Sequence, residues 1–414
     1  MTDTPVLVPL DPHAADRDAE RTRLVAAGPV ARVELPGGVR MWAVTHQDAA
    51  RRLLTDARFV KDVNRWGAWQ RGEIPEGWSL TAAVNPGRSV VTVDGADHRR
   101  LRSLTAAALT PGRVDALRPR ITEVTDELLD HLAGHGTEVV DLKSAFAFPL
   151  PMNVIGELCG LDRADTGDLR RLYDSLFSSV AGPAEVMATI AALRAFYTRV
   201  LDDKRAHPGD DLASALLAAG EGGERFTDEE VQGTLSVMVA AGHETTVNLI
   251  VNAVRALCGH RDQLDLLLTG RADWTAAVEE TLRWASPVNN FLARYATEDI
   301  DLAGTLVEEG EAVLVAYGAL GHDPAEHGPD ADRFDVTRPA TRNLAFGHGP
   351  HICPGSHLAR LEAAIALPAL FERYPELHLA VPDAELAPSP AIALNSLQAL
   401  PVRLHRQHGP ESGA

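Results

Sequence analysis

One cysteine of this chain stands in a loop whose residue types suit a buried sulfur ligand. The segment Phe346–Gly355 reads F-G-H-G-P-H-I-C-P-G, and Cys353 lies near its end. Glycine admits backbone conformations that are closed to other residues, so Gly347, Gly349 and Gly355 would let the loop approach a flat ligand closely. A cysteine at the start of a helix ionises more readily, because free N–H groups and the helix dipole favour the thiolate. The loop therefore favours a thiolate that binds a metal.

The residues beside Cys353 bear on which metal this would be. Pro354 suits the first position of a helix, where its missing N–H costs nothing. Phe346 can shield the sulfur, and the burial and hydrogen bonding of a sulfur ligand tune the metal. Taken alone, a cysteine beside proline and glycine is more often a buried small hydrophobic residue. A zinc site is disfavoured, because no second cysteine lies near Cys353.

A second candidate group combines an acid with a hydroxyl. The segment Ala241–Thr246 reads A-G-H-E-T-T and falls within a long helical pattern. Glu244 beside Thr245 offers a proton relay. Gly242 in mid-helix costs about 1 kcal/mol relative to alanine, and such a weak point can mark a local opening of the helix near a ligand. The alternative is a tolerated glycine, a surface glutamate and a threonine that bonds back to the preceding turn.

The elements that position these residues are mostly helical. From Asp97 to about Gly220 the pattern is helical almost throughout, with breaks at glycine and proline. A capping box at Thr227–Glu230 opens the longest run, for which we expect about 30 residues, or roughly 45 Å. Such a helix must cross the middle of the protein. A further helix is expected over Trp274–Ala285, and a last one begins after Cys353.

Strand signals occur on both sides of the helical part. Val30–Leu35 and Arg40–Thr45 alternate across a Pro-Gly-Gly turn, which predicts a hairpin. Short strands are expected in Phe291–Tyr317, and the tail Ile392–Leu404 is expected to be extended. The Gly/Pro-rich stretch Trp66–Gly95 is long for a connection, and long loops often bind ligands. The pattern predicts a mainly α, α-rich α+β fold.

Composition and charge exclude several classes of partner. The 414 residues carry a formal net charge of −19, which argues against nucleic acid and anionic membranes, because both need a basic face. No stretch approaches the ~20 apolar residues of a membrane span. Three cysteines without a C-x-x-C pair fit a reduced, cytoplasmic setting. No linker divides the chain, so residues 1–414 are expected to form one domain.

The pattern around the cysteine resembles that of a known family. From Phe346 to Arg360 the chain matches F-G-x-G-x-H-x-C-x-G-x-x-L-A-R, and in this it resembles the cytochrome P450 monooxygenases. The resemblance implies a triangular prism of helices with a small β-rich region. It implies haem b between the long central helix and the helix after Cys353, with this cysteine as the axial iron ligand. The implied activity inserts one oxygen atom of O2 into a C–H bond, using electrons from NAD(P)H.

The resemblance also implies roles for residues outside the cysteine loop. Thr245 would hydrogen-bond dioxygen, and Glu244 would help to deliver protons. Glu280 and Arg283 would form a structural ion pair, and either Arg333 or Arg338 would complete it. The remaining residues would contact the haem or its propionates; they are His98, Arg102, Ala241, Gly242, Arg294, Phe346, Gly347, His351 and Gly355.

The implied substrate is large and apolar. Over nearly its whole length the chain is similar to actinobacterial enzymes that hydroxylate steroids and macrolides. Ser236 stands where some steroid-hydroxylating relatives carry glutamine, which weakens a steroid assignment. Asn289 and Gln398 either orient the substrate or satisfy nearby backbone groups. The implied substrate contacts are Val84, Val237, Ala240, Val288, Asn289 and Gln398.

Ferredoxin reductase and ferredoxin are the implied electron donors to a monomeric enzyme. A basic patch on the cysteine side would steer an acidic ferredoxin; its residues are Arg99, Arg100, Arg113 and Arg360. Two alternatives stay open, namely another haem-thiolate activity, such as peroxide-driven oxidation or oxidative coupling, and a non-catalytic haem-binding protein. The acid–hydroxyl pair Glu244 and Thr245 favours the monooxygenase, because these alternatives often lack it.

Overall fold

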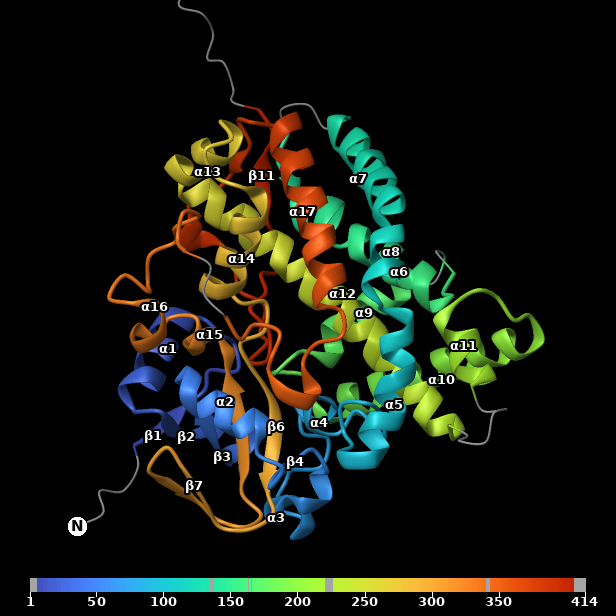
Figure 1. The fold of residues 1–414 in the computed structure, drawn as a ribbon, viewed down its shortest axis with the longest axis vertical. Helices are drawn as coiled ribbons and strands as arrows, with labels where there is room; N and C mark the ends of the chain where they lie inside the picture. Colours follow the sequence, from blue (N-terminus) through green and yellow to red (C-terminus); the bar gives the residue numbers. More distant parts are fainter. Residues whose placement is uncertain are drawn as a thin grey trace, which may run out of the picture.

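Helices make up most of the chain, and a smaller β region stands to one side of them (Figure 1). The computed structural model describes residues 6–134, 138–162, 164, 166–219, 226–339 and 343–405. Within these ranges, none of the helices combines the length and the apolar composition that a membrane crossing needs. The predicted α-rich fold with a minor sheet is confirmed.

The helices differ widely in length, and the longest of them, α12, runs through the middle of the helical part (Figure 1). Their bounds are α1 Arg17–Ala26, α2 Gln47–Thr55, α3 Gly67–Gln70, α4 Thr81–Val84, α5 Gly95–Ala108, α6 Pro111–Ala116, α7 Arg118–Ala133, α8 Pro149–Cys159, α9 Thr166–Leu176, α10 Pro183–Ala206, α11 Leu212–Ala218, α12 Asp228–Gly259, α13 Arg261–Leu268, α14 Trp274–Trp284, α15 Tyr317–Leu320, α16 Pro324–His327 and α17 Ser356–Arg373. A short π-helix, η3, covers Lys143–Ala147.

The strands form one larger sheet, in the order β1-β2-β3-β9-β6-β4, and two small ones, β10-β11-β5 and β7-β8. Their bounds are β1 Leu7–Pro9, β2 Val30–Leu35, β3 Val39–Val44, β4 Phe59–Val60, β5 Val140–Asp141, β6 Asn290–Ala296, β7 Ile300–Leu302, β8 Thr305–Val307, β9 Ala312–Ala316, β10 His378–Leu379 and β11 Pro401–Arg403. The predicted hairpin is confirmed, because β2 and β3 pair antiparallel with Leu35 opposite Val39. Its turn needs glycine, since Gly37 and Gly38 have φ angles of +80° and +74°.

The central helix α12 starts where the capping box predicted. Thr227 Oγ1 accepts a hydrogen bond from the Glu230 N–H at 3.2 Å, and the Glu230 carboxylate accepts one from the Thr227 N–H at 3.0 Å. The helix then continues for 32 residues, or about 48 Å at 1.5 Å per residue. Arg88 and Arg100 also bind the buried Glu230 carboxylate, at 2.9 and 2.6 Å. Burial alone would raise the pKa of Glu230, but these hydrogen bonds outweigh it and lower the value to about 2.

The expected ion pair on α14 ties this helix to the irregular stretch that follows β9. Both Glu280 and Arg283 are buried, and their side chains form two hydrogen bonds of 2.7 Å. The Arg283 guanidinium also donates to the backbone oxygens of Ala331 and Arg333, at 2.6 and 2.9 Å. Arg338 brings its side chain to 3.6 Å from Glu280. Of the two candidates for third member, Arg333 therefore supplies a carbonyl and Arg338 the charge.

The ends of the chain's last elements differ from the sequence expectation. Helix α17 begins at Ser356, with Gly355 as its N-cap, so the prediction that Pro354 occupies the first helical position is wrong. The residues from Cys353 to Gly355 form a turn instead. The tail is extended as a strand only over Pro401–Arg403, where β11 pairs with β5 and β10. Pairing partners, rather than residue type, set the length of this strand.

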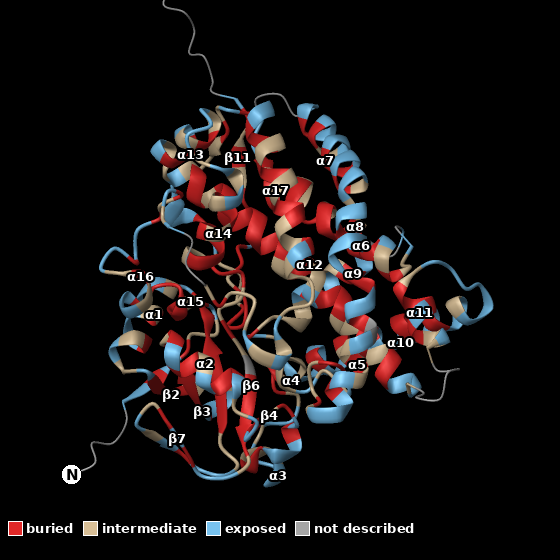
Figure 2. Cartoon of the chain, in the orientation of Figure 1, coloured by how far each residue is buried: buried red, intermediate tan, exposed pale blue. Residues whose placement is uncertain are grey.

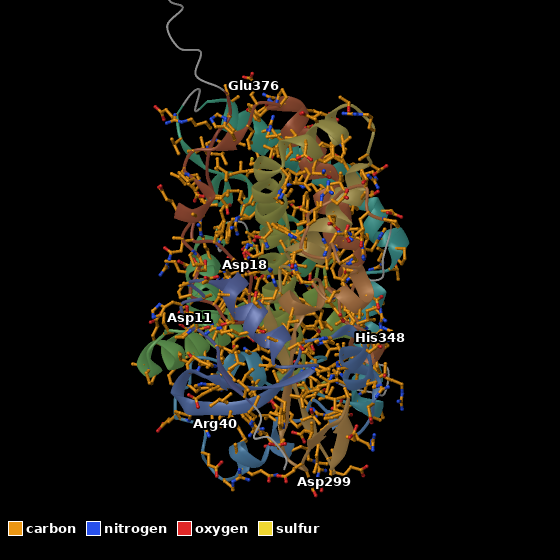
Figure 3. All side chains as sticks on the ribbon, turned by 90° about the vertical axis from the view of Figure 1, so that its left-hand side faces the viewer. Asp11, Asp18, Arg40, Asp299, His348 and Glu376 are labelled. Atoms are coloured by element: carbon orange, nitrogen blue, oxygen red, sulfur yellow. The ribbon has the colours of Figure 1, made fainter. Side chains whose placement is uncertain are left out.

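Buried faces point inward and charged side chains outward. Figure 2 shows the helices around α12 with buried faces toward the centre and exposed faces toward solvent. Asp18 and Asp299 are both exposed, and they lie well apart on the surface (Figure 3). Charges in such positions face solvent, where their cost of desolvation is avoided.

Several carboxyl groups are exceptions to this rule, and Glu362 differs from the buried Glu230 and Glu280 because it forms no ion pair with a described residue. Glu362 lies on the face of α17 that packs toward α12, and only 1% of it is exposed. Neither of its carboxyl oxygens has a hydrogen-bond partner among the described residues. The nearby Thr246 hydroxyl donates to the Gly242 carbonyl at 3.2 Å. Burial therefore raises the pKa of Glu362 to about 8, with Thr246 opposing the rise.

We predict that Glu362→Gln makes the protein more stable at pH 8 than the wild type. The pKa of Glu362 is higher in the folded than in the unfolded chain. Its protonated form therefore supports folding below pH ~4.5, and this support is lost as the pH rises toward 8, at about 1.4 kcal/mol per unit. Urea unfolding at pH 5.5 and 8 measures the effect. An equal difference between variant and wild type at both pH values would contradict it.

Candidate active site

The cysteine loop is closed by its own backbone and packed against α2. The Cys353 N–H donates to the Phe346 carbonyl at 2.9 Å. Gly347 and Gly349 have φ angles of +75° and +72°, a left-handed conformation that favours glycine. A Cβ atom at Gly349 would also lie 2.6 Å from the carbonyl oxygen of Leu54 in α2. Both glycines therefore allow a fold of the loop that other residues would strain.

The sulfur of Cys353 lies at the N-terminus of α17, although the helix starts three residues later. Burial raises the pKa of the Cys353 thiol, whereas the N–H groups of Gly355 and Ser356 lower it. The positive charges of Arg102 and Arg360 act in the same direction as these N–H groups. Gly355 has an ordinary φ of −86°, so the expectation that it needs a special conformation is wrong. A Cβ atom there would lie 3.9 Å from the Cys353 sulfur.

The ring of Phe346 is held in place from the side of α17. The Arg360 guanidinium carbon lies 4.4 Å from the centre of the Phe346 ring, which is within the range of a cation–π contact. Arg360 in turn pairs with Glu279 of α14. Asn343 also donates to Glu279, at 3.2 Å. These contacts fix the start of the cysteine loop against two helices.

An accessible stripe runs along the middle of α12. Its residues are four apart and are Gly233, Val237, Ala241 and Thr245. Residues with this spacing lie on one face of a helix. Ala241 is exposed although it lies mid-way along the longest helix, so open space must lie beside this face. The neighbouring Ala240 is buried and therefore lies outside the stripe.

The acid and the hydroxyl lie in different surroundings on α12. Thr245 belongs to the accessible stripe, and its hydroxyl donates to the Ala241 carbonyl at 2.6 Å. Such a bond to the preceding turn was the alternative to a proton relay that the sequence left open. The bond uses only the hydroxyl hydrogen, so the hydroxyl oxygen can still accept a hydrogen bond. Glu244 is buried, and burial raises its pKa. The charge of Lys143 is the largest effect that opposes this rise.

Gly242 has a packing role that the sequence did not predict. The helix α12 is continuous from Asp228 to Gly259, so no local opening marks this glycine. A Cβ atom at Gly242 would lie 3.0 Å from Ile155 Cδ1 of α8. Close approach of α8 to α12 therefore explains the glycine.

Four residues expected at the haem propionates come together as one group, called the basic cluster here: the buried His98 and Arg294 and the half-buried Arg102 and His351. The rings of His98 and His351 lie 4.1 Å apart between centroids. Arg102 donates to the Ile352 carbonyl at 2.6 Å, which joins α5 to the cysteine loop. Arg294 acts electrostatically on both histidines. The basic cluster and the cysteine loop are therefore parts of one site.

Two residues at the basic cluster were missed by the sequence reasoning. The Lys61 N–H donates to the Asp94 carboxylate at 2.6 Å, and the Lys61 ammonium donates to the Ala293 carbonyl at 2.7 Å. Burial lowers the pKa of Lys61 to about 7. Asp94 also lies 3.2 Å from the ring of His351. An acid just before α5 was a visible capping signal, but nothing in the pattern marked Lys61 as buried.

The basic cluster fits an anionic group. Burial lowers the pKa of His98, Arg102 and Arg294, and that of His351 to about 4. His98 Nε2 is buried without a partner among the described residues. Buried cations and donors are costly unless an acceptor compensates them. The two propionates of a haem would supply such acceptors, so the residues present fit this group.

The expected substrate contacts fall into more than one place. Val288 packs into an apolar cluster with Phe177, Phe291, Ala391, Ala393 and Leu394, whereas Val84 packs against another apolar cluster, around Trp66 and Trp78. Gln398 donates to the Pro388 carbonyl at 3.1 Å, which is the backbone-satisfying alternative. The Asn289 side chain lies close to the backbone of Gly318. A Cβ atom at Gly318 would lie 2.2 Å from Asn289 Oδ1, so this position needs glycine.

Comparison with known proteins places the chain in a family. The cytochrome P450 family model matches residues 274–392. The monooxygenase PikC of Streptomyces venezuelae is 41% identical over 404 residues, which cover 97% of this chain and 93% of the relative. The 2-hydroxy-5-methyl-1-naphthoate 7-hydroxylase of Streptomyces carzinostaticus is 39% identical over 401 residues, covering 95% and 97%.

Solved structures agree with the sequence relatives. The testosterone-bound CYP154C4 of Streptomyces sp. ATCC 11861 is 53% identical and has a TM-score of 0.95; the match covers 98% of this chain and 100% of that one. CYP154A1 of Streptomyces coelicolor is 41% identical with a TM-score of 0.91, covering 96% and 100%. Sequence and fold thus agree over nearly the full length. The chain belongs to the cytochrome P450 family, whose members are haem-thiolate monooxygenases.

Proposed function

We propose that this enzyme hydroxylates a C–H bond of a large apolar substrate of the steroid or macrolide type, with Cys353 as the axial ligand of haem b. One observation carries the assignment of the site. The residues just before Cys353 contact the basic cluster, since the His351 ring lies 4.1 Å from that of His98 and the Ile352 carbonyl accepts from Arg102. The cysteine sulfur and a set of arginines and hydrogen-bond donors therefore meet at one place, as a dianionic haem with a sulfur ligand requires.

The haem, when bound, supplies the oxidising chemistry with O2 and two electrons. The protein holds its propionates with the basic cluster. The N–H groups of Gly355 and Ser356 favour the ionised Cys353 sulfur, because they stabilise the charged form and oppose the rise in its pKa that burial causes. Phe346, at the start of the loop that carries the sulfur, is held by its ring contact with Arg360.

Two side chains of α12 handle protons in this proposal. The Thr245 hydroxyl lies on the accessible stripe, where its oxygen is free to accept a hydrogen bond. Glu244 is the adjacent buried acid, and burial raises its pKa, so that it takes up a proton more readily than an exposed glutamate. Reduction of O2 to water consumes protons, so an acid beside a hydroxyl meets a chemical need.

Two observations support the proposed substrate class, namely the apolar side chains beside the accessible stripe and the ligands or substrates of similar proteins. Val237 and Ala241 give the accessible stripe an apolar surface, and Val288 adds an apolar cluster with Phe177 and Phe291. Relatives of this chain include CYP154C4 with bound testosterone and a 6-deoxyerythronolide B hydroxylase of Saccharopolyspora erythraea. Large apolar ligands are bound mostly by such surfaces, with few polar contacts.

We further propose that ferredoxin reductase and ferredoxin deliver the electrons, to a cytoplasmic monomer whose three cysteines are free. Of the expected basic patch, Arg100 is neutralised by Glu230, and Arg360 by Glu279. Arg99 and Arg113 are exposed and form no ion pair with a described residue. These two charges are the ones available to steer an acidic ferredoxin.

The proposed activity is tested with testosterone and 6-deoxyerythronolide B as probes. We expect at least one of them to shift the Soret band to shorter wavelength with saturation. Turnover with NADPH, ferredoxin reductase and ferredoxin should then yield a hydroxylated product whose new oxygen comes from labelled O2. Ala241→Phe fills the accessible stripe and should abolish the shift, whereas Ala195→Phe on the exposed side of α10 should not. No shift with either probe, or an unlabelled product, overturns the proposal.

We predict that Arg294→Met weakens haem retention by roughly ten- to a hundredfold, because a hydrogen bond to a charged group contributes about 1.5–3 kcal/mol. The rate of haem transfer to apomyoglobin measures this loss. Arg99→Met removes an exposed arginine beside His98 and serves as the matched control, with an unchanged rate. Equal rates for both variants would show that Arg294 does not hold the propionates.

A further inference from the structure

A fully buried imidazole precedes the acid of α12. His243 has 0% exposure, and neither of its ring nitrogens has a hydrogen-bond partner among the described residues. A buried N–H without an acceptor destabilises the folded protein, because it has lost its hydrogen bonds to water. An apolar side chain would avoid this cost in the same space, so the imidazole calls for a functional explanation.

The surroundings of His243 leave it few acceptors. Its ring lies edge-on to Phe148, with centroids 4.4 Å apart, and Tyr173 is the next ring, at 6.3 Å. The ring Nδ1 lies 3.5 Å from Oε2 of Glu244. The other acceptor beside the ring is the backbone of Phe148. The measured distance from Nδ1 is to the Glu244 carboxylate, which the Nδ1–H reaches after a small rotation of the ring.

The protonation state of His243 decides what it can contribute. Burial lowers the pKa of His243 to about 3, and the charges of Lys143 and Arg170 lower it further. The ring is therefore neutral near pH 7 and carries one N–H. It serves as a hydrogen-bond donor there and does not store a proton.

Charged groups act on Glu244 from the elements packed around it. They are Lys143 of η3 and Arg170 and Asp174 of α9. Lys143 is fixed in place, since its ammonium donates to the Ser396 hydroxyl at 3.1 Å and to the Leu397 carbonyl at 2.7 Å. Among the described residues, no lysine or arginine forms an ion pair with the Glu244 carboxylate itself. The His243 ring nitrogen, at 3.5 Å, is thus a close polar neighbour of this carboxylate.

We propose, on the basis of the proposed role of Glu244 in proton delivery, that His243 is a positioning residue whose Nδ1–H binds the ionised Glu244 carboxylate. This bond stabilises the charged form of the acid and holds its carboxylate in one orientation. His243 thereby governs how readily Glu244 takes up a proton and passes it toward the Thr245 hydroxyl. It acts through Glu244 and has no contact with the haem or the substrate in this scheme.

The test is an infrared pH titration of the haem-loaded protein without substrate. The carboxyl band of Glu244 is assigned by its loss in Glu244→Gln. His243→Phe keeps an aromatic ring against Phe148 and removes the donor, so the titration midpoint of Glu244 should rise by about one pH unit. His243→Asn places an amide N–H near the Nδ1 position and should restore the wild-type midpoint. His243→Gln reaches the Nε2 position instead and should behave like His243→Phe.

Catalysis gives a second readout, with testosterone as the probe. His243→Phe should lower the product formed per NADPH severalfold and raise hydrogen peroxide, while the testosterone affinity from the Soret shift stays unchanged. His243→Asn should recover most of the product yield.

The two proposals fail in different ways. A midpoint in His243→Phe or His243→Gln equal to that of the wild type overturns the role of His243. An unchanged product yield in Glu244→Gln overturns the proton-delivery role of Glu244, whatever the midpoint of the acid. If His243→Phe does not fold, the comparison of His243→Gln with His243→Asn decides the question.

Discussion

A negatively charged sulfur inside a protein is stable only where fixed dipoles and cations replace the water it has lost, and the rest of this structure depends on that constraint. At Cys353, burial opposes ionisation, and the first N–H groups of α17 together with Arg102 and Arg360 favour it. The loop must therefore end at a helix N-terminus. Its bond from the Cys353 N–H to the Phe346 carbonyl and its two left-handed glycines give it that shape.

The basic cluster faces the corresponding problem for positive charge, which also needs partners once it has lost water. Here cationic and donor groups are buried, and their pKa values are lowered because their charge is poorly solvated. Asp94 compensates part of this charge through His351, and an anionic cofactor would compensate the rest. Cys353 and one member of the basic cluster, His351, lie two residues apart in one loop. A single bound group can therefore satisfy both, which couples cofactor binding to the order of the loop.

Much of the fold followed from patterns that act locally. The capping box at Thr227 predicted the start of α12, and the alternation around Pro36 predicted the β2–β3 hairpin. The start of α17 was misplaced because proline suits a turn as well as a first helical turn. Gly242 was misread because its cause, the close approach of Ile155, lies on another helix. Sequence spacing shows which face a residue lies on, but not what packs there.

At the site, too, the sequence predicted some residues and missed others. His98, Arg102, Arg294 and His351 were named from the resemblance, and the structure brings them together. Lys61 and Asp94 were missed, because only tertiary contacts reveal that a lysine is buried or that an acid pairs across the fold.

The central claim is that the Cys353 sulfur binds the haem iron, and the absorption spectrum of the ferrous–CO complex tests it most directly. The account predicts the red-shifted Soret band of a thiolate-ligated haem in the wild type, in Cys159→Ala and in Cys258→Ala, and its loss in Cys353→Ala. Retention of that band in Cys353→Ala would contradict the account.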